Sequence, residues 1–362
     1  MSKVRGWETV FVGIDLAWGP RNRTGVVAAA GGSVVDSRTV VSDDQICDWL
    51  DPYMGCPVLV AIDAPLIVRN PAGTSRPCDR KISKVFGASH AGAHSANLGL
   101  AAFSDSVRAE RLARRLGLST DPYIQPGQPV RRMIEVYPHP AMVSLFGLSY
   151  TLKYKAKRGR SMVDRRQAFA ALIAHLERLT ISDPPLSVAT APRWDELRDS
   201  LVVATSDGQL DLIEDELDAY MCAYIGFYYW THGASRCRVV GDVETGYIVT
   251  PVTPAIGAAL DAVVLETPVR RVRKDGVVPR QSTNAVRLAP TRARQIAPTP
   301  AGQCGCGCGG PVRNRYRPGH DARHKEGLIR AALAGQVEAE TRLTDLGWSK
   351  FLESRRASGR WG

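Results

Sequence analysis

Short apolar runs that end at acidic residues recur through the first part of the chain. Residues 9–14 are β-branched and apolar and lead into Asp15, and Val58–Ile62 leads in the same way into Asp63. Continuous apolar runs of this length, bounded by turn residues, are typical of strands buried on both faces. Each run therefore predicts a buried strand with a carboxylate at its end.

Three further segments have strand character. Residues 25–30 and 33–41 are separated by Gly31 and Gly32, which permit a tight turn, so they predict an antiparallel continuation of the first strand. Residues 133–137 form another apolar run, broken at once by Pro138, and Glu135 lies inside it. A glutamate in an apolar strand is locally inconsistent, which often marks a functional position.

Apolar residues at helical spacing predict four helices in the body of the chain. The last of them begins with acidic residues, including Asp215 and Asp218, and becomes almost wholly apolar from Leu217 onward, which predicts a buried helix with an acidic start. The expected helices span residues 43–50, 104–116, 165–179 and 214–230. Strands that alternate with helices in this order predict an α/β fold.

The pattern also predicts three parts of the chain. Residues 1–254 carry the strands and helices, with an irregular insertion at 66–129, after the fourth strand, that would suit a lid. Residues 255–302 lose this periodicity and become rich in Arg and Pro, as expected of a linker. Residues 303–362 predict a small module with a Cys/Gly cluster and one helix at about 325–346.

Charge is distributed unevenly over these parts. From Glu266 onward the chain has 19 Lys and Arg against 8 Asp and Glu, which accounts for the whole net charge of +11. A localised basic segment suits polyanions such as nucleic acid, although a solvated extension would have the same composition. We therefore expect a neutral body with a cationic tail, and nucleic acid as the partner.

The N-terminal sequence and the cysteines bear on the compartment. The first residues lack the apolar stretch of a signal peptide, and no later run is long enough to span a membrane. Five of the eight cysteines lie in ordinary or apolar contexts, which does not suggest a disulfide scaffold. These features predict a cytoplasmic protein without a membrane partner.

Acidic residues at strand ends predict the chemistry of the body. If the strands share one sheet, their carboxylates converge, and the resulting repulsion is relieved by Mg²⁺ or Mn²⁺, which prefer carboxylate and water oxygens. Two such ions at a short separation can activate water and stabilise the leaving oxygen when a phosphodiester is hydrolysed. The candidate catalytic and metal-binding residues are Asp15, Asp63, Glu135 and Asp218, with Asp215 as the second choice on its helix. Taken singly, each acid is equally well explained as a cap or turn residue.

Basic residues near these acids are candidates for phosphate contacts. Arg76 and Arg80 lie in the insertion, close to Asp79, and a surface salt-bridge network would have the same sequence. Lys153, Lys155 and Arg158 surround Tyr154, a combination that favours backbone phosphates with base stacking, or else a solvated loop.

The Cys/Gly cluster of the tail predicts a second kind of site. Cys304, Cys306 and Cys308 alternate with glycine, so an extended chain would place their sulfurs on one side. His320 or His324 would complete a tetrahedral zinc site. The spacing departs from the usual paired cysteines of zinc modules, and a Cys/Gly segment without metal is the alternative.

Several motifs occur together in a fixed order. They are GIDLAWG at 13–19, AIDAPL at 61–66, EVYPHPA at 135–141, LKYK at 152–155, DELDAY at 215–220 and GYIVTP at Gly246–Pro251. Over roughly residues 10–254 the chain resembles domain-of-unknown-function family 429, whose members are described as predicted nucleases of the ribonuclease H-like fold. The resemblance implies that fold, a mixed sheet flanked by helices, and an acidic site at Asp15, Asp63, Glu135 and Asp218.

Three functions compete at this stage. The first is a metal-dependent nuclease that hydrolyses phosphodiester bonds. The second is a non-catalytic nucleic-acid-binding protein on the same fold. The third is a nucleotide phosphotransferase like the actin-like ATPases and sugar kinases, against which counts the lack of a second glycine-rich phosphate hairpin in the sequence.

Overall fold

The computed structural model describes residues 8–19, 22–265 and 320–358 and divides into two units. The first unit is Met1–Arg271 and the second is Val272–Gly362. Each unit is described separately below.

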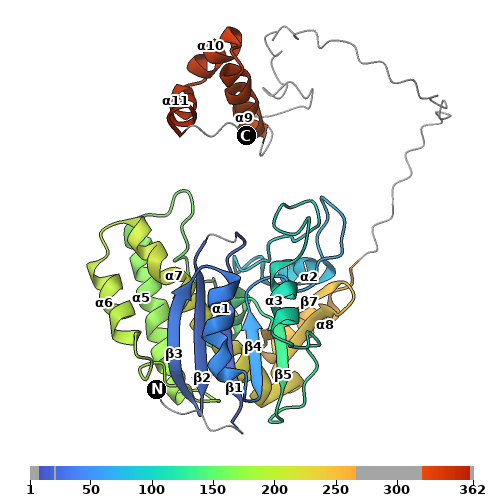
Figure 1. The fold of residues 1–362 in the computed structure, drawn as a ribbon. Coiled ribbons are helices and arrows are strands. Elements are labelled where there is room, and N and C mark those ends of the chain that lie inside the picture. The colour runs from blue at the N-terminus through green and yellow to red at the C-terminus, as the bar shows by residue number, and fades with distance from the viewer. Residues whose placement is uncertain (1–7, 20–21, 266–319, 359–362) are drawn as a thin grey trace, which may run out of the picture. The chain divides into compact units, whose positions relative to one another are not determined.

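A five-stranded mixed sheet forms the centre of the first unit (Figure 1). β2 runs antiparallel to both its neighbours, whereas β1, β4 and β5 are parallel to one another. The strand order is β3-β2-β1-β4-β5, and the strands are β1 (Val10–Asp15), β2 (Thr24–Ala30), β3 (Ser33–Val40), β4 (Val58–Ile62) and β5 (Arg131–Glu135). The carboxyl ends of the three parallel strands therefore meet at one edge, which is where side chains of distant segments converge.

The long helix α7 (Asp207–His232) crosses one face of this sheet and contacts β1, β2 and β4. The approach is so close that a Cβ at Gly13 would lie 1.9 Å from the carbonyl oxygen of Ala219. A Cβ at Gly25 would lie 1.8 Å from the carbonyl oxygen of Asp215. Only glycine permits this backbone contact. It fixes residues 215–219 of α7 beside β1 and β2, although the sequence predicted that this helix begins only at residue 214.

Other helices complete the layers. In Figure 1, α1 (Asp43–Leu50) and α3 (Arg108–Arg115) lie over the face of the sheet nearer the viewer. On the α7 side, α5 (Met162–Glu177) and α6 (Trp194–Val203) pack against α7. Short 3-10 turns occur at Asp51–Tyr53, Arg178–Ile181 and Gly233–Ser235. The predicted mixed sheet flanked by helices is confirmed.

A second, smaller core lies beyond β5. It is built on the hairpin of β6 (Cys237–Asp242) and β7 (Gly246–Pro251), against which α2 packs. The helices around it are α2 (Pro77–Phe86), α4 (Pro138–Phe146) and α8 (Pro254–Ala262). The sequence pattern predicted none of these helices, and it placed the fifth strand two residues too late, at 133–137 rather than Arg131–Glu135.

Three helices make up the described part of the second unit. They are α9 (His320–Leu333), α10 (Val337–Asp345) and α11 (Ser349–Ser358), and they share a small apolar core that includes Leu328, Ala339 and Leu352. The sequence predicted one helix at 325–346. The break falls at Gly335, whose φ of +86° is accessible to glycine but not to a continuing helix.

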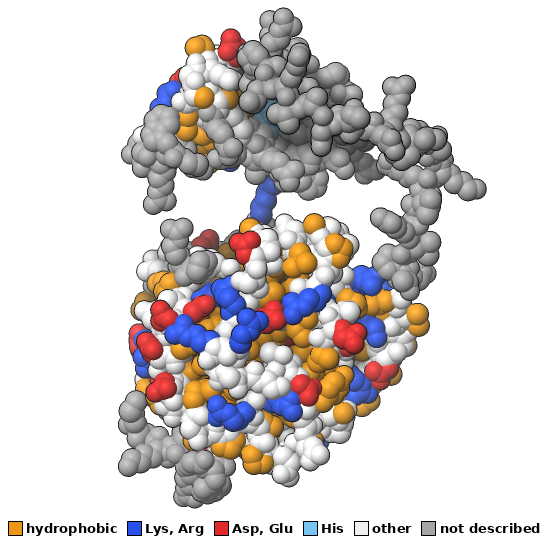
Figure 2. Space-filling model, turned by 45° about the vertical axis from the view of Figure 1, so that its right-hand side comes forward, with side chains coloured by type: hydrophobic (Ala, Val, Ile, Leu, Met, Phe, Trp, Pro, Cys, Tyr) orange, Lys and Arg blue, Asp and Glu red, His pale blue; other side chains and the backbone are white. Residues whose placement is uncertain are grey.

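Acidic and basic side chains are mixed on the visible face of the first unit (Figure 2), in keeping with its balanced composition. None of the helices in the described ranges has the length and apolar character needed to cross a membrane.

Candidate active site

Strand register brings Asp15 and Asp63 together. Ile14 on β1 pairs with Ile62 on β4, so the two aspartates are the next residues on neighbouring parallel strands, and the amide of Asp63 donates to the carbonyl of Ile14 at 2.8 Å. Because side chains alternate along a strand, Asp15 lies on the same face as Gly13, the face that α7 covers. Both carboxylates therefore face the start of α7.

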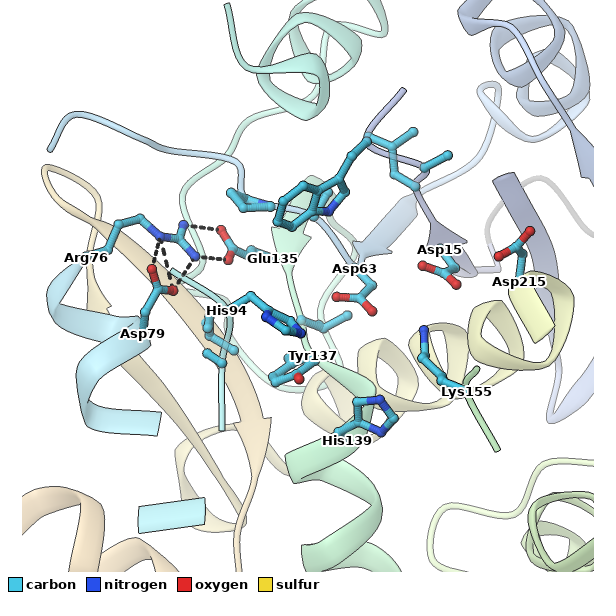
Figure 3. Close-up of a pocket in the computed structure, with 18 residues that line it drawn as sticks. Asp15, Asp63, Arg76, Asp79, His94, Glu135, Tyr137, His139, Lys155 and Asp215 are labelled. Atoms are coloured by element: carbon cyan, nitrogen blue, oxygen red, sulfur yellow. Dashed lines mark hydrogen bonds and ion pairs between the residues drawn. The ribbon is translucent and has the colours of Figure 1, made fainter. Parts of the chain in front are cut away.

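A pocket of about 480 Å³ lies at this edge of the sheet. Asp15 and Asp63 line it from the strand ends, and Asp215 lines it from α7. Figure 3 shows these three carboxylates around the ammonium of Lys155, which points toward Asp15 and Asp63. The sheet and the helix thus bring together Asp15, Asp63 and Asp215 out of the five acids that the sequence put forward.

Burial and mutual repulsion make the cluster electrostatically strained. Burial, with repulsion from Asp218, raises the pKa of Asp63 to about 7, despite the opposing effect of Lys155. The same causes raise the pKa of Asp15 well above its usual value. Burial also raises the pKa of Glu214 to about 7 and that of Asp215 to about 6. Strongly raised pKa values in a pocket mark it as a candidate functional site.

Asp218 is held from two sides beneath this pocket. Its side chain is fully buried, Oδ1 accepts a hydrogen bond from the Tyr154 hydroxyl at 2.5 Å, and the Lys155 ammonium lies 2.5 Å from Oδ2. The contact between Lys155 and Oδ2 does not meet the angle of a hydrogen bond. The attraction between the two opposite charges is nevertheless strong, because they lie close together in a buried place. Asp215, the second choice from the sequence, therefore faces the pocket, while Asp218 anchors Lys155.

Glu135 is turned away from the two aspartates. It pairs in register with Ile62, one position before Asp63, so it points to the opposite face of the sheet. Its carboxylate instead accepts hydrogen bonds from Arg76, with 2.6 Å between Nη2 and Oε1, and from the amide of Leu66. Glu135 still reaches the pocket wall, but its charge is neutralised by a buried arginine.

Arg76 is committed to this buried network. Its Nη1 also donates to the carbonyl of Ile67, and its Nε and Nη2 donate to Asp79. These bonds, with those to Glu135, use all the N–H groups of the guanidinium. The sequence suggested a phosphate contact for Arg76, and the geometry corrects this: no donor is left for a phosphate, and Arg76 positions Glu135.

The other predicted basic residues are dispersed. Lys153 and Arg158 are exposed in the segment between α4 and α5, whereas Lys155, from the same segment, is turned into the pocket. Arg80 is half-buried on α2, and its Nε has no hydrogen-bond partner among the described residues. Only Lys155 joins the acidic cluster.

Aromatic and histidine side chains that the sequence did not mark as a group line the rest of the pocket. They are Trp18, His94, Tyr137 and His139. Trp18 is 49% exposed and contacts Phe103 edge-on. Burial lowers the pKa of His139 to about 4, so this imidazole is neutral at pH 7 and is no source of an imidazolium proton.

The donor chemistry of the pocket fits Mg²⁺ or Mn²⁺. Within the described residues, the carboxylates of Asp15 and Asp63 have neither a hydrogen bond nor an ion pair, and hard divalent cations bind such oxygens. In the same ranges no three His, Cys, Asp or Glu side chains form a ready cage for an ion. An ion held by Asp15 and Asp63 would need further ligands from outside these two side chains, as Mg²⁺ commonly does.

The predicted zinc ligands fall mostly outside the described residues. Cys304, Cys306 and Cys308 lie outside them. His320 begins α9, and His324 follows one turn later, with its ring edge-on to Trp348 at 6.2 Å between centroids.

Comparison with known proteins identifies the family. No curated protein and no solved structure matches the chain. The family described as "Protein of unknown function (DUF429)" matches residues 13–245, a span that includes every carboxylate of the pocket and more than half of the chain. The chain therefore belongs to the DUF429 family, as its ordered motifs predicted.

Proposed function

We propose that the first unit is a divalent-metal-dependent nuclease of the ribonuclease H-like fold. The observation that carries the proposal is the pair Asp15 and Asp63, adjacent at the ends of parallel strands, facing Asp215 across a pocket and without partners of their own in the described residues. Paired carboxylates in this state are suited to a metal ion that acts on phosphodiesters.

The topology supports the fold assignment. The order β3-β2-β1-β4-β5, with only β2 reversed, is the arrangement expected of a ribonuclease H-like sheet. The acids also follow the pattern of that fold, with one at the end of the first strand, one after the fourth and one on the late helix. Fold alone does not specify function, so the proposal depends on the pocket.

The residues of the pocket divide the work of hydrolysis. Asp15 and Asp63 would hold the metal ion, and Asp215 lines the same pocket. A bound Mg²⁺ or Mn²⁺ supplies Lewis acidity and a more acidic water. Lys155 presents a fixed positive charge to the phosphate, since Asp218, Asp15 and Asp63 together outweigh its desolvation and raise its pKa well above the usual value. Trp18, half exposed at the pocket, offers a surface on which a base can stack.

Exposed cations would guide the strand toward this pocket. Lys153 and Arg158 lie in the segment that delivers Lys155, and the basic tail adds a larger, sequence-independent attraction. The substrate class we propose is therefore a nucleic acid, held by its phosphates near the pocket.

The test is cleavage of labelled single-stranded, duplex, hybrid and branched nucleic acids in Mg²⁺ or Mn²⁺. Asp15→Asn and Asp63→Asn should each abolish cleavage while leaving the fold intact. Asp44→Asn is the matched control, because Asp44 is exposed on α1 and paired with Arg115 outside the pocket. Cleavage that persists in both pocket variants would refute the proposal.

A second candidate is a nucleic-acid-binding protein without catalysis. The observation that favours it is that no three potential ligands in the described ranges form a cage for an ion. In that case nucleic-acid binding would be salt-dependent, would survive loss of Asp15 and Asp63, and would occur without turnover.

A further inference from the structure

Lys155 is built into the acidic cluster rather than placed on its surface. Its ammonium lies 2.5 Å from Oδ2 of Asp218 and 3.8 Å from Oε1 of Glu214. One third of the side chain remains exposed, on the side that lines the pocket. The sequence offered this lysine as a phosphate contact or as part of a solvated loop, so its pairing with the acids is a feature that the fold adds.

The backbone on both sides of Lys155 is pinned. The carbonyl of Lys155 accepts a hydrogen bond from Arg160 at 2.7 Å. The carbonyl of Tyr154 accepts one from the buried Arg165, also at 2.7 Å, and the hydroxyl of Tyr154 donates to Asp218. These contacts hold the ammonium in one place, as a positively charged component of a catalytic site must be held.

The charges around the pocket leave two aspartates over. Five acids lie around Lys155, and three of them have a cation within 4 Å. Asp218 has Lys155 at 2.5 Å, and Asp215 has Arg23 at 3.8 Å. Glu214 has Arg165 at 3.5 Å, an arginine that it shares with Asp207 and Asp211. Asp15 and Asp63 have none among the described residues. Asp15 and Asp63 are therefore the two carboxylates of this group that are open to a divalent cation.

We infer that the site binds a single divalent cation on Asp15 and Asp63, and that Lys155 supplies the second positive charge that a two-metal nuclease takes from a second ion. This inference rests on the proposed function. In two-metal sites the ions lie about 3.5–4 Å apart and share carboxylates. Here Asp218, a natural ligand for a second ion, is already engaged by Tyr154 and Lys155.

The number of ions bound tests the inference directly. Mn²⁺ is titrated into the full chain by calorimetry, and free Mn²⁺ is counted in parallel by electron paramagnetic resonance. The wild type should bind one ion at the pocket, and this binding should be lost in Asp15→Asn. Lys155→Gln should bind two, because removal of the ammonium frees Asp218. Lys153→Gln, which removes an exposed charge two residues away, should bind one.

A second variant guards against misfolding. Lys155→Gln leaves the buried Asp218 unpaired, whereas the double variant Lys155→Gln with Asp218→Asn removes both charges and should again bind one ion. Two ions at the pocket of the wild type, or one ion in a folded Lys155→Gln, would overturn the inference.

These outcomes separate the inference from the proposed function. Two ions in a wild type whose cleavage requires Asp15 and Asp63 would leave the nuclease standing and remove the role of Lys155. No ion in any variant, with no cleavage, would remove both.

Discussion

The guanidinium of Arg76 and the carboxylate of Glu135 meet in the interior, 2.6 Å apart and 2% and 4% exposed. Arg76 also pairs with Asp79, so one cation serves two buried acids from α2 and β5. The pair joins the small core around α2 to the edge of the central sheet.

Loss of this arginine should be costly. Arg76→Met strands Glu135 and Asp79 without a counter-charge, and removing one partner of a buried ion pair typically costs about 3–5 kcal/mol. Arg69→Met is the control, since its pair with Glu110 is largely exposed and is worth less than about 1 kcal/mol. Urea unfolding followed by circular dichroism measures both. Equal losses of unfolding free energy in the two variants would show that the buried pair contributes no more to stability than the exposed one.

The acidic pocket should make the metal-free protein more stable as the pH falls. The pKa of Asp63 is raised to about 7 in the folded chain, above its unfolded value of about 4, so folding takes up protons between these limits. The destabilising charge is therefore fully present above pH 7 and is relieved as the pH falls toward 4. Lys155 stays protonated throughout.

This dependence should shrink when the carboxylate is removed. In EDTA, Asp63→Asn should be more stable than the wild type at pH 8, by on the order of 1 kcal/mol, and the difference should fade by pH 5. Asp44→Asn should show no such trend. The midpoints of urea unfolding at pH 8, 6.5 and 5 measure the effect. The prediction is wrong if the stability of the wild type falls relative to that of Asp63→Asn as the pH is lowered from 8 to 5.

Gly13 and Gly208 offer a matched pair of glycines for the contact between sheet and helix. Gly13→Ala would place a methyl group 1.9 Å from Ala219 O, which requires α7 to shift, at a cost of roughly 3 kcal/mol and with lost metal affinity. Gly208→Ala, on the second residue of α7 and with open space around it, should be neutral or slightly stabilising. Thermal unfolding and Mn²⁺ titration of both variants are the measurements. If Gly13→Ala is as stable as the wild type and binds Mn²⁺ with the same affinity, α7 can move away from the sheet without cost.

Trp18 should contribute to substrate binding and little to stability. It is 49% exposed at the pocket, and a base stacked on an aromatic ring is worth about 1–3 kcal/mol. Trp18→Ala should weaken binding of a single-stranded oligonucleotide roughly tenfold. Tyr123→Ala, at a 59% exposed position outside the pocket lining, should leave binding unchanged. Fluorescence anisotropy of a labelled oligonucleotide measures both, and equal affinities would remove Trp18 from the substrate surface.

The tail retains its zinc prediction. Purified full-length protein should carry about one zinc ion per chain, since one tetrahedral site takes four Cys or His ligands. Changing Cys304 and Cys306 together to Ser should release it, while Cys56→Ser, a buried cysteine of the first unit, should not. Elemental analysis after gel filtration measures the zinc content per chain. If the wild type is refolded in the presence of zinc and still contains none, the zinc prediction is wrong.

The central sheet could be predicted from sequence because its strands are apolar throughout. β4 lies at the predicted residues, and β1 to β3 begin or end within one residue of prediction. Three of the helices that escaped prediction begin with proline. Pro77, Pro138 and Pro254 break the pattern, yet each occupies the first turn of a helix, where a missing N–H costs nothing. The helix α6, which also escaped prediction, begins at Trp194. Local pattern could not separate a helix start from a strand end.

The sequence predicted which acidic residues lie near the site, but it did not predict which cations pair with them. Asp15, Asp63 and Asp215 were found because each interrupts or ends an apolar element. The direction of Glu135 depends on a register shift of one residue, and its partner Arg76 lies 59 residues away in sequence. Lys155 resembles its solvated neighbours in sequence. Long-range contacts of this segment, such as those of Tyr154 with Phe169 and Asp218, hold it inward, and the local sequence does not reveal them.

The contact of α7 with Gly13 and Gly25 sets the spacing between the two halves of the acidic site by backbone against backbone. The atoms nearest to both glycines are backbone atoms of α7, so this spacing does not depend on which side chains line the rest of the pocket. The backbone contact thus keeps α7 at a fixed distance from the sheet. Substitutions of other lining residues, such as Trp18 or Tyr137, can therefore change which ligands fit the pocket while the distance between its carboxylates stays the same.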